Sequence, residues 1–122
     1  MNLRPDTIAT LRALAEPNRL RIVELLRTGP LAVGEIGERL GMRQPQVSKH
    51  LRVLKEAGLA VVRVDAQRRL HALRPEPLRE LDAWLEPYRR VWTARLDALE
   101  RRLDAMADDA PAATPRRGEE AR

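Results

Sequence analysis

Polar and basic side chains cluster on one short stretch of the chain. They are Gln44, Gln46, Ser48, Lys49 and Arg52. Amides, hydroxyls and cations are the groups that contact base edges and phosphates in the major groove of DNA. The same stretch carries three apolar residues at helical spacing, Val47, Leu51 and Leu54, which predict that the opposite side of a helix is buried. A solvated face of mixed charge is the alternative interpretation.

The segment upstream of this stretch favours the DNA-binding interpretation. Residues 32–40 have the pattern of a second short amphipathic helix, and Gly41 ends it shortly before Gln44. Pro45 is compatible with a helix start, because the N–H that proline lacks would have no partner in the first turn. Gly58 stands where a helix C-terminus favours a left-handed residue. Two short helices joined by a tight turn make a helix-turn-helix.

The segment downstream predicts a small hairpin. Residues 60–65 are apolar and rich in valine, which is typical of a strand. Residues 65–68 are suited to a turn, and residues 69–73 to a returning strand. The result is a β-wing that carries Arg68 and Arg69 at its tip.

Positive charge is concentrated on the same region. Residues 43–74 hold eight Lys or Arg and two acids, a net charge of +6, whereas the formal net charge of the whole chain is +5. Such a concentration is the electrostatic footprint of phosphate binding. A generally Arg-rich composition is the alternative explanation, since 21 of the 23 cations are Arg.

Three motifs follow one another in this part of the chain. Glu-Pro-Asn-Arg-Leu-Arg-Ile at 16–22 is similar to the opening helix of the ArsR/SmtB winged helix-turn-helix regulators. Val-Gly-Glu-Ile at 33–36 resembles the first helix of their reading head, and Gln-Pro-Gln-Val-Ser-Lys-His-Leu at 44–51 resembles their recognition helix. The resemblance covers residues 13–74 without a gap. It implies a mainly α fold with a small β-wing, which dimerises through N- and C-terminal helices and regulates transcription.

Two kinds of contact are expected in a complex with DNA. The base-reading side chains are Gln44, Gln46, Ser48 and Lys49. Gln is suited to adenine and Lys to guanine. The phosphate-binding side chains are Arg43, Arg52, Arg68 and Arg69. His50 is expected either to contact a phosphate or to be partly buried on its helix.

The sequence departs from the family pattern at three positions. Ala32 replaces the usual Ser or Thr before the first reading-head helix, and Arg43 replaces the small polar cap of the recognition helix. Each change loses a capping acceptor that typically contributes about 1 kcal/mol. Gln67 stands where the wing turn commonly has glycine.

Two terminal helices are expected to serve assembly. One spans residues 6–15 with Asp6 as its N-cap, and the other spans residues 77–107, with a kink or break near Glu86 caused by Pro87. The second helix would be about 45 Å long. It cannot bury its apolar stripe on a winged core of about sixty residues. We therefore expect a homodimer, which the resemblance also implies, and an inverted-repeat operator.

The predicted dimer interface consists of apolar and aromatic side chains from both terminal helices. They are Ile8, Leu11, Leu81, Trp84, Leu85, Tyr88, Trp92, Leu96, Leu99 and Leu103. The three aromatic residues recur at every fourth position. They are expected either to pack in the dimer core or to line a pocket for an apolar effector.

Several classes of protein are not expected. The chain has no cysteine, which excludes disulfides and thiolate metal sites. Neither histidine, His50 or His71, is on the last helix, so we expect no sensory metal site and no cofactor. His71 is expected to have a structural role. No constellation suited to an enzyme is present. No apolar run is fit for a signal peptide or a membrane span, so a cytoplasmic protein is expected.

We expect residues 1–107 to form one winged domain and residues 108–122 to form a disordered tail. The leading hypothesis is a sequence-specific regulator of transcription, and specifically a repressor. It would bind double-stranded DNA as a homodimer and leave either when an effector binds, for which an unidentified small molecule is one candidate, or when a condition changes. Two alternatives stay open: a winged-helix module for protein–protein assembly, and a metal- or small-molecule-binding protein whose DNA contact is incidental.

Overall fold

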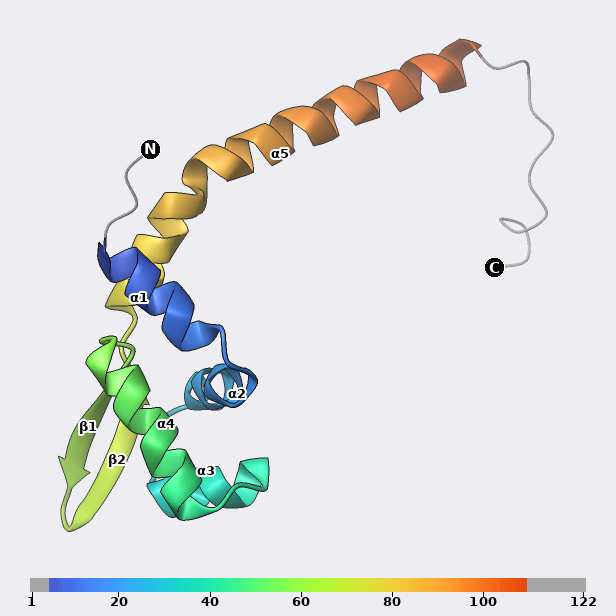
Figure 1. Cartoon of the computed structure of the whole chain (residues 1–122). Helices are drawn as coiled ribbons and strands as arrows, with labels where there is room; N and C mark the ends of the chain where they lie inside the picture. The colour runs from blue at the N-terminus through green and yellow to red at the C-terminus, as the bar shows by residue number, and fades with distance from the viewer. Residues whose placement is uncertain (1–4, 110–122) are drawn as a thin grey trace, which may run out of the picture. The chain divides into compact units, whose positions relative to one another are not determined.

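The computed structural model describes residues 5–109, which form five helices and a two-stranded hairpin (Figure 1). The elements are α1 (Pro5–Leu14), α2 (Pro17–Leu26), α3 (Val33–Leu40), α4 (Gln44–Glu56), β1 (Ala60–Asp65), β2 (Arg68–Leu73) and α5 (Glu76–Asp109). The predicted fold class, mainly α with a small β-wing, is confirmed. The chain divides into two compact units, residues 1–85 and 86–122. Of the predicted tail, only residues 108 and 109 are described, and both are helical.

The start of α2 is held by a side chain of the residue before it. Glu16 is the N-cap, and its carboxylate accepts a hydrogen bond from the N–H of Arg19 at 2.9 Å. Pro17 follows in the first turn, where its missing N–H is harmless. The predicted cap of α1 is wrong. That helix begins at Pro5, which puts Asp6 inside its first turn.

The turn between α3 and α4 is tight and depends on two glycines. Gly41 adopts the left-handed conformation, with φ 67°, and ends α3. The N–H of Met42 donates to the carbonyl of Gly37 at 2.9 Å. A Cβ at Gly37 would lie 2.6 Å from the carbonyl oxygen of Met42, so no side chain fits between the two segments. The predicted helix-turn-helix is confirmed.

One apolar core joins the helices of the first unit to the base of the hairpin. Nine of its members come from α2, α3, α4 and residues 59–60 at the entry to β1. They are Ile22, Val23, Leu26, Ile36, Val47, Leu51, Leu54, Leu59 and Ala60. The predicted buried stripe of α4 is therefore confirmed. From α1, Ala13 belongs to the buried core and the partly buried Leu14 packs against it, while Thr7 and Thr10 are also buried.

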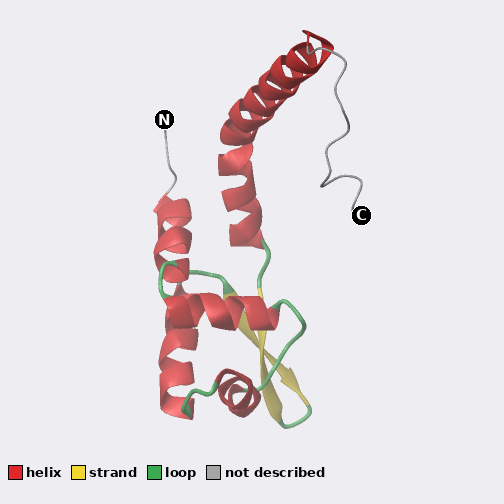
Figure 2. Ribbon diagram, turned by 90° about the vertical axis from the view of Figure 1, so that its right-hand side faces the viewer, coloured by secondary structure: helices red, strands yellow, loops and turns green. Residues whose placement is uncertain are grey.

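The hairpin is a regular antiparallel pair. Val62 pairs with His71, and Asp65 pairs with Arg68 at the turn, so the predicted wing is confirmed (Figure 2). Gln67 stands where the family's wing turn commonly has glycine, and in this turn the neighbouring Ala66 adopts the left-handed conformation, with φ 57°. A further bridge, not predicted, joins Leu31 to His71 through main-chain hydrogen bonds of 3.0 and 2.7 Å. This bridge fastens the base of the wing to the segment that enters α3.

The last helix is continuous through Pro87. The alternative of a break near Glu86 is therefore wrong. In the second unit, no residue between 86 and 108 is buried. Four leucine or tryptophan side chains are more than half exposed there: Trp92, Leu96, Leu99 and Leu103.

The close approach at Gly37 leads to a test of the helix-turn-helix. We expect Gly37→Ala to lower the free energy of unfolding by about 1–3 kcal/mol, because its methyl group would meet a main-chain carbonyl. Gly34→Ala is the matched control on the same helix. There the methyl group would meet only the flexible amide of Gln44, at 3.3 Å, and we expect a change within about 1 kcal/mol. Urea unfolding measures both, and equal midpoints for the two variants would contradict the close approach.

Candidate DNA-binding surface

The recognition helix α4 has one buried side and one exposed side. Val47, Leu51 and Leu54 are at most 1% exposed. The polar residues predicted to meet DNA from this helix are all exposed: Gln44, Gln46, Ser48, Lys49 and Arg52. Arg43, immediately before the helix, is exposed as well. Neither Arg43 nor Ala32 makes a side-chain cap, as the sequence predicts.

The two predicted arginines at the wing tip are also exposed, and one of them has a partner. Nη2 of Arg68 lies 2.6 Å from Oε1 of Glu35, which is in the first turn of α3. The same carboxylate oxygen accepts a hydrogen bond from the N–H of Ala32 at 3.0 Å. Ion pairs between such exposed side chains contribute little to stability, so a phosphate can compete for Arg68.

Glu35 is a site residue that sequence analysis missed. Its signal is local: a Glu three residues after the N-cap position is half of a capping box, even where Ala32 cannot supply the other half. The N–H of Ala32, and then the guanidinium of Arg68, hold the pKa of Glu35 below its usual value. Glu35 is therefore charged at neutral pH and keeps the wing arginine close to α3.

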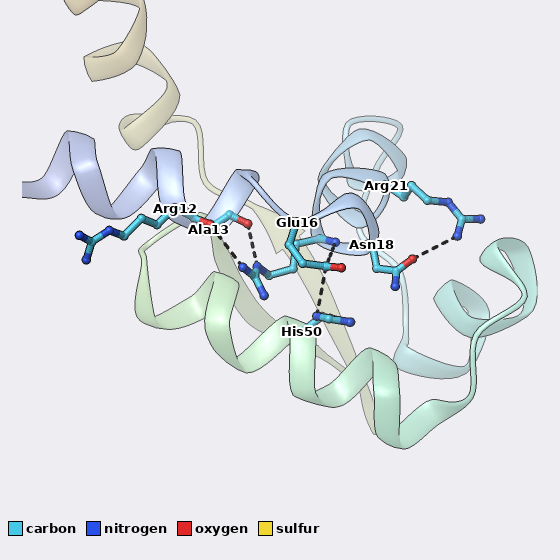
Figure 3. Close-up of polar contacts among 7 residues, drawn as sticks. Arg12, Ala13, Glu16, Asn18, Arg21 and His50 are labelled. Carbon is cyan, nitrogen blue, oxygen red and sulfur yellow. Dashed lines mark hydrogen bonds and ion pairs between the residues drawn. The ribbon is translucent and has the colours of Figure 1, made fainter.

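His50 lies differently from the other predicted contacts. Its side chain is 13% exposed, and its Nδ1 is 3.6 Å from Oε2 of Glu16 (Figure 3). This is the partly buried alternative of the two that the sequence leaves open. The other alternative, a contact between His50 and a DNA phosphate, stays a prediction, and the partly buried side chain does not favour it.

Contacts of Glu16 and of Arg19 together connect three helices at this point. Its carboxylate caps α2 and faces His50 of α4, while Nε of Arg19 donates to the carbonyl of Ala13 in α1 at 2.7 Å (Figure 3). Partial removal from water opposes ionisation of Glu16. The N–H groups of Arg19 and Asn18, and the charge of His50, outweigh this effect and lower its pKa. The recognition helix is thus tied to the scaffold by a polar contact as well as by its apolar stripe.

His71 is buried in the base of the wing, with 8% of its surface exposed. Burial, and then the charges of Lys55 and Arg69, lower its pKa below the ordinary value of 6.5. Its main chain forms the bridge to Leu31. These contacts agree with the structural role expected for this residue.

Two further properties concern the part of the chain that the structure describes, residues 5–109. There, no group of three or more His, Asp or Glu side chains is arranged to hold a metal ion. In the same range, no helix is both long and apolar enough to cross a bilayer.

Comparison with known sequences gives the class of protein that this architecture defines. The family described as bacterial regulatory protein, arsR family, matches residues 16–61. The HTH-type transcriptional regulator Rv2034 of Mycobacterium tuberculosis is 42% identical over 98 residues, which span 80% of this chain and 89% of that protein. The residues matched by the family, 16–61, include the helix-turn-helix and the start of the wing.

Solved structures agree. The crystal structure of an ArsR family transcriptional regulator, RHA00566, superposes with a TM-score of 0.63 at 28% identity, over 76% of this chain and 97% of that one. The homodimeric winged helix-turn-helix domain Mb0332 of Mycobacterium bovis gives a TM-score of 0.57 at 29% identity, over 70% of this chain and 79% of that one. This chain belongs to the ArsR family. It is a transcriptional regulator with a DNA-binding winged helix-turn-helix and is not an enzyme.

The lowered pKa of His71 predicts how stability depends on pH. Because the folded protein binds a proton at His71 less readily than the unfolded chain, the unfolding free energy falls as pH drops below 6.5. His71→Gln removes this contribution, so the variant should lose less stability than the wild type between neutral and mildly acidic pH. Urea unfolding in buffers without phosphate measures the difference. The same pH dependence in both proteins would contradict the assignment.

Proposed function

We propose that this regulator is a repressor that binds an inverted-repeat operator as a homodimer. The observation that carries the proposal is the exposed polar face of α4, which lies in the same compact unit as the arginine-bearing wing. A recognition helix in the major groove and a wing on the backbone would use these two surfaces together. The proposal puts the protein where the cell keeps its DNA, in the cytoplasm.

The polar face of α4 supports direct reading of bases. Gln46, Ser48 and Lys49 are exposed on the first two turns of the helix, which is the end that enters the groove in helix-turn-helix proteins. The amide nitrogen of Gln44 lies near Gly34 of α3, so this side chain stands where the two helices of the reading head meet. A bidentate contact between an amide and adenine discriminates by about 1–3 kcal/mol.

The arginines around this face supply phosphate contacts without sequence preference. Arg43 stands at the start of α4, Arg52 further along the same helix, and Arg68 and Arg69 at the wing tip. In this proposal, Arg68 exchanges the carboxylate of Glu35 for a phosphate. His50 is assigned to positioning α4 against Glu16 rather than to the DNA.

Exposed apolar side chains support the homodimer. In α1, Ile8 and Leu11 are each more than a third exposed, because another side of the helix, with Thr10 and Ala13, is the buried one. The part of α5 in the second unit, as far as residue 108, buries no residue, and Leu96 and Leu99 are more than half exposed. Burying a leucine stabilises by about 1.5–3 kcal/mol. A second copy of the chain would cover the exposed apolar side chains of both α1 and α5.

The aromatic residues fit the same assignment. Trp84 and Tyr88 are half-buried, and Trp92 is 55% exposed. We assign them to the dimer interface, which is the first of the two alternatives that the sequence leaves open. An effector pocket formed by these rings would require the dimer to be assembled first. Two-fold symmetry would place the recognition helices about 34–36 Å apart, one turn of DNA.

Base reading and phosphate binding are separable by mutation. The test is fluorescence anisotropy with a duplex selected by the protein from a random library, against a scrambled duplex of equal composition. We expect Gln46→Ala to cost about 1–3 kcal/mol on the selected duplex and almost nothing on the scrambled one. Arg68→Ala should weaken both equally and reduce the salt dependence. If the wild type itself shows no duplex preference and no salt dependence, the assembly-module alternative replaces this proposal.

The dimer is tested by sedimentation at micromolar concentration. We expect the wild type to sediment as a dimer and Leu96→Glu as a monomer, because the charge would enter an apolar interface. Leu20→Glu is the matched control, since Leu20 is 42% exposed in α2 and is not in the predicted interface. A stable wild-type monomer rules the homodimer out.

A further inference from the structure

The part of α5 in the second unit carries an apolar stripe with a regular spacing. From residue 86 to residue 109, six large apolar side chains are exposed, and five of them are separated by alternating steps of four and three residues. These five are Trp92, Leu96, Leu99, Leu103 and Met106. Such alternation is the heptad repeat of a coiled coil, in which two helices bury the repeating residues against each other. The spacing therefore identifies another helix as the partner of this stripe.

The heptad repeat also gives the stripe its limits. The seven positions of the repeat are lettered a to g, and positions a and d form the core. Leu96 and Leu103 occupy position a, and the other three residues of the stripe occupy position d. The preceding position a holds the charged residue Arg89. We therefore define the seam as residues 92–106, which lie entirely in the second unit.

The net charge around the seam disfavours DNA or an anionic membrane as the partner. Residues 86–109 contain five Arg and six Asp or Glu, a formal net charge of −1. Surfaces rich in phosphate are bound by an excess of cations, which this segment does not have. A second copy of the same helix offers an apolar seam of equal length and identical spacing.

The charged residues beside the seam favour one direction for the second helix. Positions e and g flank the core, and in a parallel coiled coil position g of one helix meets position e of the following heptad in the other. Arg95 occupies position g and Glu100 occupies position e, and both side chains are exposed. A parallel pairing in register thus forms the contact between Arg95 and Glu100 twice, once from each copy.

An antiparallel pairing would bring like charges together. Its flanking contacts join position g to position g and position e to position e. In one register of the core, Arg95 of one copy meets Arg102 of the other. In the other register, the two copies of Arg102 meet, and so do the two copies of Glu100. Because like charges repel at these distances, charge complementarity favours the parallel pairing.

We propose that residues 92–106 of two copies of this chain pair as a parallel, in-register two-stranded coiled coil. The inference rests on the proposed homodimer and specifies how the second units of its two copies meet. A parallel pair has a two-fold axis along its length, which agrees with the two-fold symmetry of an inverted-repeat operator. Identical residues then stand opposite each other along the whole seam.

Disulfide formation reports which residues stand opposite each other. The chain has no cysteine, so Trp92→Cys and Met106→Cys each give the full chain a single thiol at one end of the seam. Each variant is equilibrated at micromolar concentration in a glutathione redox buffer and run on a denaturing gel without reductant. We expect disulfide dimers in both. In either antiparallel register the two thiols would be about 15 Å or more apart, whereas a disulfide requires Cα atoms within about 7 Å.

Ala94→Cys is the control for these variants. Ala94 is exposed on the same helix but occupies position f, on the side away from the seam. It should form about tenfold less disulfide dimer, because its thiols meet only by collision. Equal cross-linking in all three variants, or none in Trp92→Cys and Met106→Cys, would overturn the parallel pairing.

Sedimentation of the wild type separates this inference from the proposed function. A wild type that sediments as a dimer while the two disulfides fail to form contradicts only the coiled coil. A stable wild-type monomer contradicts the homodimer and the coiled coil together.

An exchange of charges tests the direction of the helices independently. Glu100→Arg should weaken the dimer about tenfold in sedimentation equilibrium, because it replaces two attractions by two repulsions. Adding Arg95→Glu to the same chain should restore the wild-type affinity. Asp104→Arg makes the same change of charge at position b, away from the seam, and should leave the affinity within about twofold of the wild type. Equal weakening by Glu100→Arg and Asp104→Arg, or no restoration in the double variant, would overturn the parallel orientation.

Discussion

Burial of the apolar stripe of α4 is the constraint on which the DNA-binding surface depends. Val47 and Leu54 are fully buried, so the helix cannot rotate without exposing them. Rotation would cost about 25 cal/mol of free energy for each Å² of apolar surface that it exposes to water. The tight approach of Gly37 to Met42 limits translation of α3 against α4 in the same way. Gln46 and Lys49 face solvent because the opposite, apolar side of their helix is fixed in the core.

The polar contacts refine this arrangement. Glu16 faces His50 on the inner side of α4, and Glu35 holds Arg68 near α3. The main-chain bridge from Leu31 to His71 joins the wing to the same scaffold. Each contact links segments that are distant in the sequence. Together they set where the wing and the recognition helix stand before any DNA is present.

Periodicity was sufficient to predict the elements that hold the surface. The spacing of Val47, Leu51 and Leu54 identifies both the buried and the exposed side of α4, because helical geometry alone relates them. The contacts of Glu16 and Glu35 were not predictable, since no local pattern says which distant cation a carboxylate meets. The wrong break at Pro87 has a physical reason as well. A proline removes one hydrogen bond from a long helix, and the remaining turns continue it.

Site-directed cleavage of DNA tests most directly whether α4 enters the major groove of a two-fold operator. The chain has no cysteine, so Pro45→Cys, at an exposed position in the first turn of α4 that is assigned no DNA contact, provides a single attachment point for an iron–EDTA reagent. We predict cleavage of the selected duplex at two groups of positions about 10 base pairs apart, one for each recognition helix. Cleavage spread evenly along the duplex, or none at all, would contradict the account.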